Sequence, residues 1–524
     1  EINYSDPTLK RSSPISSAGS DEDAPSIMAR GKWVKIRLKK DGIYKMGFSR
    51  LKKLGFHEPG NVLVYGNFCG LLNTCNDSTK DYRLKQIPVA YEKGGDNQFN
   101  KNDYMLFYAR GPHIWQYDRK EDFFFKNNHL YTDYAYCYLT EDATRKNVLS
   151  QLEEPNGEAV EQVEQFMDYQ HHEERSRNLI ESGQEWVGEY FDFTLQREFQ
   201  FDFPHIVESI PVKVSGHFVS RSSFTSNFSV SYADERIFST AIPAVRYDYT
   251  GYYARTRNGS GTFLPGSDNL SLQVAYEKGT PSAEGWLNYL TVNAVRELTM
   301  VGNQMHFRYK SPDDVKIVEI RLAEAPENTE IWEVTDQENI RRIHNLHRTA
   351  NSVSFKIQAD TVYRSFIAFN HQEYYSPEQY ESVDNQNLHG MGPHDMLIIS
   401  KARFTGEAES LADLHRKHDG LDIAVVTDKQ IYNEYSSGKP DPSAIRNFVR
   451  MIYNRSSRED SLKYLLLFGD GSYDNKHSGE SPFLMTYQSE ESFNYSRSFV
   501  SDDFFGLLDP DEDIEGSASG LIDI

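Results

Sequence analysis

The sequence predicts a multidomain protein of the β + α/β class, in which two mainly β domains precede an α/β domain built on a parallel sheet. Two observations predict this fold class. Between about residues 30 and 390, apolar and polar residues alternate over short segments, as they do in half-buried strands. After about residue 391, short apolar strands alternate with helical segments. A chain of 524 residues also exceeds what one hydrophobic core supports, so several domains are expected.

The chain is expected to begin with a flexible leader and a mainly β domain. Residues 1–29 are rich in Ser, Pro, Asp and Ala and show no hydrophobic periodicity, which is typical of a segment without structure of its own. The β domain is expected to span residues 30–155. Its first segment, WVKIRLKKDGIYKM, alternates apolar and basic residues and contains Asp41-Gly42, a pair that predicts a hairpin turn.

A polar linker, residues 156–185, is expected to lead into a β-sandwich over residues 186–390. The clearest signal is the segment FDFTLQREFQFDF, whose apolar residues fall on one face of a strand. They are Phe191, Phe193, Leu195, Phe199, Phe201 and Phe203. Such a stripe could be a carbohydrate platform, but the strict alternation favours the buried face of a sandwich.

The last part of the chain, residues 391–524, is expected to be the first half of an α/β domain. The apolar segments DMLIIS, LDIAVVT and YLLLF alternate with two helical patterns. This order predicts right-handed βαβ units and a parallel sheet that is covered on both faces. Asp441 is the expected N-cap of the second helix, and Pro442 is its expected first residue.

Charge and hydropathy exclude two classes of function. The formal net charge of −22 argues against a nucleic-acid partner, because binding to phosphates requires a basic surface. No apolar run approaches the roughly 18 residues that a membrane-spanning helix needs, so no transmembrane segment is predicted.

The chain has three cysteines, Cys69, Cys75 and Cys137. The spacing of Cys69 and Cys75 is compatible with a disulfide and equally with two free thiols. No cysteine follows Cys137, so the α/β part contains no thiol nucleophile. The chain ends on GLIDI, an apolar run that resembles the start of a strand, and we expect the α/β domain to continue beyond residue 524.

The segment LLLFGDGSYDNK places Asp470 just after the third predicted strand of the α/β part. Ligands of parallel sheets gather beyond the carboxyl ends of the strands, so Asp470 is a candidate site residue. The segment lacks the third glycine of a dinucleotide fingerprint, the Gly-Lys-Ser/Thr of a P-loop and the Gly-x-Ser-x-Gly of a hydrolase elbow. A tight turn that uses Gly and Asp for their backbone tolerance remains the alternative.

The C-terminal segment SDDFFGLLDPDEDIEG is strongly acidic. Asp509, Asp511, Asp513 and Glu515 are spaced at alternate residues, which is the rhythm of a calcium-binding loop. It lacks the glycine at the sixth position and the glutamate at the twelfth position of an EF-hand. A solvated acidic hairpin is therefore the alternative interpretation.

Several segments together resemble the gingipain-type (C25) cysteine peptidases, and within them the sortase of the type IX secretion system of Bacteroidetes. They are GIYKMGFSRLKKLGF, NDYMLFYARGPHIW, NQNLHG, IYNEYSSGKPDPSAIRNFVRMIY, LKYLLLFGDGSYDNK and SDDFFGLLD. The resemblance implies a caspase-like α/β peptidase domain, with a His-Gly motif and a nucleophilic Cys at the ends of later strands. Neither of these later motifs occurs in this chain, so the catalytic His and Cys are expected beyond residue 524 and the chain alone should be inactive.

The resemblance also implies a site, partners and a location. A structural calcium ion would be bound by Asp470 together with Asp509, Asp511, Asp513 and Glu515. The enzyme would act at the cell surface, exported and associated with the outer membrane. Its partners would be secreted cargo with C-terminal signal domains, a lipopolysaccharide acceptor and an outer-membrane β-barrel protein of the attachment complex.

Two other functions remain open from the sequence. One is a secreted gingipain-like protease, in which the β region would be a prodomain. The other is a non-catalytic surface scaffold or binding protein, which the absence of a nucleophile within the chain would suit.

Overall fold

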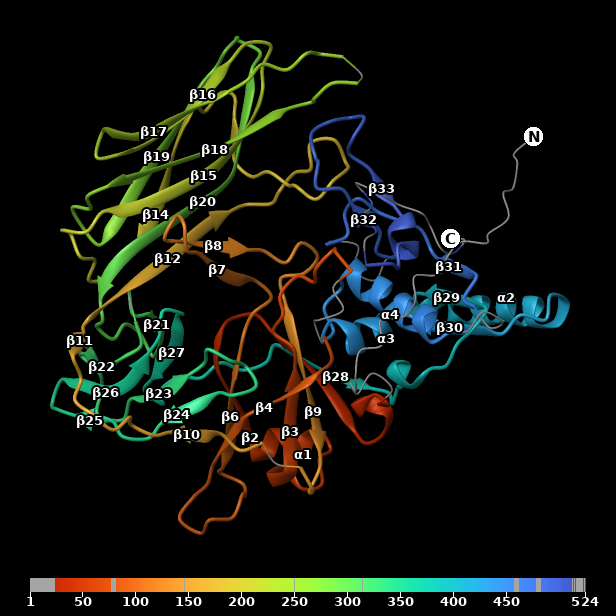
Figure 1. Ribbon diagram of the computed structural model, residues 1–524, viewed down its shortest axis with the longest axis horizontal. Helices are drawn as coiled ribbons and strands as arrows, with labels where there is room; N and C mark the ends of the chain where they lie inside the picture. The colour runs from red at the N-terminus through yellow and green to blue at the C-terminus, as the bar shows by residue number, and fades with distance from the viewer. Residues whose placement is uncertain are drawn as a thin grey trace.

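The computed structural model describes residues 24–76, 82–145, 147–248, 250–312, 314–456, 461–476 and 482–510, and the single residues 512, 514, 522 and 524. Its architecture confirms the predicted fold class. Sheets of mainly antiparallel strands occupy the chain up to β28, and a parallel α/β sheet follows (Figure 1).

Two packed sheets form the N-terminal unit. The first contains, in spatial order, β28 (Gln379–Val383), β1 (Trp33–Leu38), β9 (Ala135–Glu141), β3 (Val62–Gly66) and β4 (Lys85–Ile87). The second contains β2 (Gly42–Gly47), β6 (Tyr104–Ala109) and β5 (Val89–Glu92). Shorter elements of this unit are η2 (Ile27–Ala29), α1 (Phe48–Lys53), η3 (Pro59–Asn61) and the hairpin of β7 (Ile114–Asp118) and β8 (Phe123–Asn127). Ile36, Leu106 and Leu139 lie in the core between the sheets.

The hairpin predicted at Asp41-Gly42 is wrong. β1 pairs with β28 and β9, whereas β2 pairs with β6, so the chain passes from one sheet to the other at this turn. The Asp41 carboxylate accepts a hydrogen bond from the backbone N–H of Gly111, 2.7 Å away, which ties the turn to the end of β6 instead of closing a hairpin.

The predicted sandwich face forms, with two exceptions. One layer contains β12 (Gln165–Glu173), β20 (Glu284–Glu297), β15 (Val212–Arg221) and β18 (Arg255–Phe263), with β13 (Tyr190–Phe191) also on β20. The other contains β14 (Gln196–Asp202), β19 (Asn269–Glu277), β16 (Ser226–Tyr232) and β17 (Glu235–Ile242). Phe199 and Phe201 are buried between the layers, but Phe193 is 97% exposed and Leu195 is 37% exposed, because the chain leaves the sheet between β13 and β14.

A further pair of sheets is built mainly from residues 186–390, where the sequence predicts one sandwich. One contains β10 (Ser150–Leu152), β24 (Arg341–Ile343), β23 (Glu330–Glu333), β27 (Arg364–Phe369) and β21 (Gln304–Tyr309). The other contains β11 (Glu161–Val163), β22 (Lys316–Ala323), β26 (Ser352–Ala359) and β25 (His347–Arg348). β10 and β11 join these sheets by parallel pairing, and β12 pairs with β20. β11 and β12 lie in the predicted linker, so parts of that linker are strands.

The α/β part is a parallel sheet in the order β30 (Ile423–Thr427), β29 (Met396–Ser400), β31 (Tyr464–Phe468). Its helices are α2 (Thr405–His418), α3 (Asp428–Tyr435) and α4 (Pro442–Arg455). The remaining elements are η4 (Leu388–Gly390), η5 (Ala402–Phe404), β32 (Tyr487–Gln488), β33 (Val500–Ser501) and η6 (Asp503–Gly506). Ile398 packs with α2, while Leu397 and Ile399 pack with α3 and α4, so both faces are covered.

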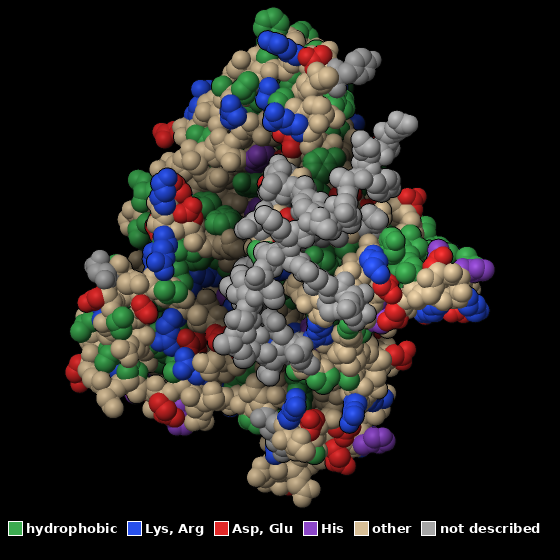
Figure 2. Space-filling view, turned by 45° about the vertical axis from the view of Figure 1, so that its right-hand side comes forward, with side chains coloured by type: hydrophobic (Ala, Val, Ile, Leu, Met, Phe, Trp, Pro, Cys, Tyr) green, Lys and Arg blue, Asp and Glu red, His purple; other side chains and the backbone are tan. Residues whose placement is uncertain are grey.

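The α/β part lies against both the N-terminal unit and the sandwich (Figure 1). Leu72 and Tyr131 of the N-terminal unit belong to the same buried cluster as α3 and α4. On the face shown in Figure 2, positively and negatively charged side chains are interspersed over the surface of the described residues. No helix among the residues that the structure describes is long and apolar enough to cross a membrane.

Candidate functional site

Asp470 lies immediately beyond the carboxyl end of β31, where the sequence placed it. Its side chain is exposed, and Oδ1 accepts a hydrogen bond from the backbone N–H of Gly471, 2.8 Å away. Its carbonyl accepts a hydrogen bond from the N–H of Leu484 at 2.8 Å, so the turn runs beside the later segment that contains Leu484. Gly471 is required here, since a Cβ would lie 2.7 Å from Cγ2 of Thr486.

The rest of the turn, up to Lys476, continues along the same neighbouring segment. Ser472 accepts a hydrogen bond at Oγ from the N–H of Asp474 (3.0 Å), and its carbonyl accepts from Oγ1 of Thr486 (3.3 Å). The buried Asn475 amide donates to the Thr486 carbonyl at 2.9 Å. The turn is thus ordered by side chain to backbone contacts within the α/β part.

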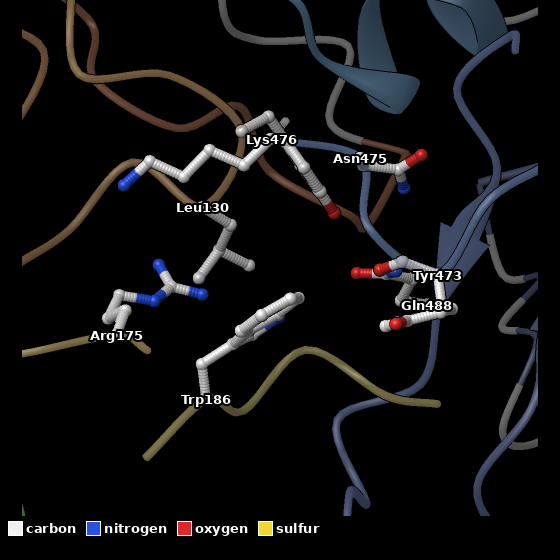
Figure 3. A pocket seen from close by; sticks show the side chains of 8 residues that line it. Leu130, Arg175, Trp186, Tyr473, Asn475, Lys476 and Gln488 are labelled. Atoms are coloured by element: carbon white, nitrogen blue, oxygen red, sulfur yellow. The ribbon is translucent and has the colours of Figure 1, made fainter. Parts of the chain in front are cut away.

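The other side of the turn faces the β region (Figure 3). The Tyr473 ring lies nearly parallel to the Trp186 ring, with centroids 6.2 Å apart, and Lys476 pairs with Asp133 at 2.7 Å. Between these side chains, Leu130 and Arg175 line a cavity of about 10 Å³. That volume suits a single water molecule and no substrate.

A second charged group at the carboxyl edge of the sheet was missed from the sequence. Lys401, the first residue after β29, contacts Asp428, the first residue after β30, with Nζ and Oδ2 2.7 Å apart. Asp428 is buried at the start of α3, and Thr427 caps this helix with its side chain. The rule that placed Asp470 applies to both, because each follows a parallel strand directly.

Asp470 and Asp509 form hydrogen bonds with different segments of the chain. The Asp509 N–H donates to Oε2 of Glu512 at 2.9 Å, and its carbonyl accepts from Nδ2 of Asn76 at 2.7 Å. The other predicted calcium ligands, Asp511, Asp513 and Glu515, lie outside the described residues. Within the described part of the chain, no three His, Cys, Asp or Glu residues gather closely enough to hold a metal ion.

All three cysteines are free thiols. Cys137 is buried in the N-terminal sheet, and burial raises the pKa of its thiol. Cys69 is half-buried with its Sγ 3.8 Å from Nζ of Lys439, and Cys75 is exposed. A buried, protonated thiol is a poor nucleophile, so Cys137 has a structural role.

The family of the α/β part follows from a comparison with known sequence families. The model of the peptidase C25 family matches residues 389–524, which begin just before β29 and include the turn that carries Asp470. Residues 389–524 belong to peptidase family C25. This confirms the resemblance that the sequence motifs indicated, and we call residues 389–524 the C25 region. No curated protein matches the sequence.

Nearly the whole chain is similar to one solved structure. The crystal structure of dimeric latent PorU from Porphyromonas gingivalis aligns with a TM-score of 0.79 and 25% sequence identity. The alignment covers 93% of this chain and 47% of the PorU chain, so this chain spans about half of the length of PorU. The Cry4Aa toxin of Bacillus thuringiensis aligns over 49% of this chain and 58% of its own, at 9% identity and a TM-score of 0.18, which carries no argument.

Proposed function

We propose that this chain is the N-terminal part of a cell-surface cysteine endopeptidase and transpeptidase, the sortase of a type IX secretion system. The enzyme removes the C-terminal signal domain from secreted cargo and joins the new carboxyl end to an amine of anionic lipopolysaccharide. The C25 match and the similarity to PorU along 93% of the chain support this proposal.

In the proposed reaction, a thiolate attacks the scissile carbonyl and expels the signal domain as the amine leaving group. The resulting thioester is then attacked by the acceptor amine, which forms a new amide and frees the thiol. The C25 region contributes the carboxyl edge of the parallel sheet, with Asp470 and the Lys401–Asp428 pair. The thiol itself is expected outside this chain, because no cysteine lies within residues 389–524.

The observation that carries the proposal is that the β region is built into the core of the C25 region. The connection between α3 and α4 contains Ser436, Ser437, Gly438, Lys439 and Asp441, and all of them except the glycine are buried polar residues. Each of these groups needs a partner once it is removed from water.

The N-terminal unit supplies partners for Ser437, Lys439 and Asp441, whereas the Ser436 hydroxyl donates to carbonyls of its own region. Nζ of Lys439 donates to the Asn67 carbonyl at 3.1 Å, and the N–H of Leu72 donates to the Asp441 carboxylate at 2.9 Å. Leu72, from the N-terminal unit, also lies in the hydrophobic cluster of α3 and α4. A β region that left as a prodomain would expose this core. The structure therefore favours a permanent N-terminal part, as in the sortase, over a gingipain-like prodomain.

The proposed partners are secreted cargo with C-terminal signal domains, the lipopolysaccharide acceptor and an outer-membrane β-barrel protein of the attachment complex. The proposed location is the outer face of the outer membrane, to which the exported protein would be tethered by this complex. Both follow from the proposed reaction, since its acceptor is a surface lipid.

The reaction is tested on the full-length protein with a cargo protein that ends in a C-terminal signal domain and with diglycine as the amine. Mass spectrometry should find the cargo carboxyl joined to diglycine. A variant with Cys69, Cys75 and Cys137 all replaced by Ala should keep this activity, and iodoacetamide should abolish it in both proteins. Cleavage that yields only the free acid would point to a gingipain-like protease, and absence of cleavage would overturn the proposal.

We also propose a structural calcium ion at Asp470 and the acidic segment of Asp509, Asp511, Asp513 and Glu515. The exposed Asp470 carboxylate has one oxygen bound to its own turn, and carboxylate oxygens are the ligands that calcium prefers. Calcium should raise the melting temperature of the protein, and Asp470→Asn or Asp513→Asn should abolish this rise. Asp360→Asn, at an exposed position in the β region, is the matched control. A wild-type protein whose melting temperature does not change when calcium is added would contradict the proposed calcium site.

A further inference from the structure

We propose that residues 182–187, here called the bridging segment, position the turn of residues 469–476 for the reaction of the C25 region. The bridging segment spans the boundary between the predicted linker, residues 156–185, and the predicted sandwich, and it connects the sandwich to the C25 region. This inference rests on the proposed function for its catalytic consequence, whereas its structural part can be tested without activity.

The bridging segment runs along residues 488–498 of the C25 region. The Gln184 N–H donates to the Ser489 carbonyl at 3.1 Å, and its side-chain amide donates to the Gln488 carbonyl at 2.6 Å. Two further contacts involve Glu185 N–H with Oγ of Ser492 (3.0 Å) and Ser182 Oγ with Oγ of Ser498 (2.9 Å). Contacts that fix backbone groups set the register of the two segments more firmly than flexible side-chain pairs do.

Gly183 brings the two backbones together. It has a φ of +78°, which favours glycine, and a Cβ at this position would lie 2.7 Å from Cα of Ser492. A side chain at residue 183 would therefore push the bridging segment away from the C25 region.

The bridging segment is anchored firmly at its sandwich end. The Val187 N–H donates to the Arg177 carbonyl at 2.8 Å, and Val187 is fully buried in a cluster with Trp286 of β20. Phe493 of the C25 region inserts into the same cluster, and its carbonyl accepts from the N–H of Tyr253 at 2.7 Å. The sandwich and residues 488–498 thus share one small hydrophobic core.

From this anchor, Trp186 reaches the turn that carries Asp470. Figure 3 shows Trp186 and Tyr473 approaching the same cavity from the two parts of the molecule. The Asp133–Lys476 pair fixes the end of the turn. The turn is consequently held on one side by residues 482–488 and on the other by the β region.

The two contacts differ in what they contribute. Asp133 is about half exposed and Lys476 about one fifth exposed, and a pair that solvent screens in this way contributes little to stability. The Trp186–Tyr473 contact packs large rings that restrict where the turn can lie. Trp186 is therefore a positioning residue, which acts on the reaction through the turn.

Hydrogen exchange of the protein tests this role directly. Trp186→Leu should speed exchange of residues 469–476 about tenfold and leave β29, β30 and β31 unchanged, since only the turn loses its support. Trp186→Phe should restore protection. Trp115→Leu is the matched control, because Trp115 stacks on Tyr169 within the β region, with ring centroids 3.7 Å apart. Gly183→Ala should have the same effect as Trp186→Leu, with Gly302→Ala, a positive-φ glycine in open space, as its control.

Exchange of residues 469–476 in Trp186→Leu at the wild-type rate would overturn the inference. In the full-length enzyme, Trp186→Leu should lower kcat more than it raises KM, and Trp186→Phe should recover kcat. Faster exchange with no peptidase activity in the wild-type protein would leave the positioning role standing and contradict the proposed function. Faster exchange with unchanged kcat would overturn the catalytic consequence alone.

Discussion

The β region meets the C25 region at two places that differ in kind. At the α3–α4 connection, Ser437, Lys439 and Asp441 are buried and the N-terminal unit supplies partners to each of them. At the bridging segment, contacts to backbone groups join parts that stay partly exposed, beside one small apolar cluster that includes Val187 and Phe493. The first contact lies in the larger core of α3 and α4 and holds the regions together, whereas the second holds the shape of one turn.

The comparison therefore separates stability from positioning. Substitutions at the buried connection should unfold the protein, because they leave cavities, clashes or unpaired groups in a shared core. Substitutions around the bridging segment should change local motion and leave global stability nearly intact.

The largest effect is expected for Gly438→Ala. Gly438 has a φ of +80°, and a Cβ there would lie 2.5 Å from the Tyr138 hydroxyl and 2.7 Å from Nζ of Lys35. Backbone strain and overpacking together should lower the free energy of unfolding by about 4 kcal/mol. Urea denaturation measures this change. Gly420→Ala, with a φ of +68° and open space around it, should cost only about 1 kcal/mol. Equal costs at the two glycines would show that the connection is loosely packed.

Leu72→Ala should have the next largest effect. Leu72 comes from the N-terminal unit and is 3% exposed within the core of α3 and α4. Removing its side chain should lower the free energy of unfolding by about 3 kcal/mol. Leu264→Ala, at a residue that is 61% exposed, should change it by less than about 0.5 kcal/mol. A similar small change for Leu72→Ala would mean that the two regions do not share a core.

Glu434→Gln should reveal a pH dependence on α3, the helix that leads into the buried connection. Glu434 is buried on α3 and accepts hydrogen bonds from the N–H of Leu388 at 2.9 Å and from Nδ1 of His389 at 2.6 Å. Burial alone would raise the pKa of this carboxyl, but the hydrogen bonds hold it below its ordinary value of 4.5. Its stabilisation is therefore present above pH 4.5 and is lost as the pH falls through the folded-state pKa.

The variant should lose about 2 kcal/mol at neutral pH, since Gln leaves part of this buried network unpaired. Its stability should also fall less steeply than that of the wild type below pH 4.5. Thermal melts between about pH 3 and about pH 7, which span the titration of the carboxyl group, measure both effects. Parallel acid profiles for the two proteins would rule out this role of Glu434.

The smallest effect on stability is expected for Asp133→Asn. This change removes the ion pair with Lys476 and should lower the free energy of unfolding by about 0.5 kcal/mol. Exchange of residues 469–476 should nevertheless become faster. A stability loss as large as that of Leu72→Ala would mean that the Asp133–Lys476 pair stabilises the whole protein, as the buried connection does.

Local signals in the sequence predicted local structure well. Asp441 accepts from the N–H of Ser443 as the N-cap of α4, and Pro442 is the first residue of that helix, because both effects depend on neighbouring residues only. Period-two alternation placed Phe199 and Phe201 in the sandwich core, and the rule for parallel sheets placed Asp470 at a strand end.

Pairings between distant segments could not be predicted in this way. β1 pairs with β28 through Trp33 and Val383, although nothing near Trp33 in the sequence specifies this partner. The same limit hid the contact of Trp186 with Tyr473, because a polar segment with Gly and Glu gives no signal for what it will touch. The wrong hairpin at Asp41-Gly42 has this cause too, since a turn signal does not say which strands pair.

The most direct test of the shared core is to cut the chain between the two regions. A protease site inserted after Gly392, which is exposed and has open space around it, would separate β28 from β29. After cleavage, the two halves should elute together from a size-exclusion column and melt in a single transition close to that of the uncut protein. Halves that separate without denaturant would contradict the account and restore the interpretation of the β region as a removable prodomain.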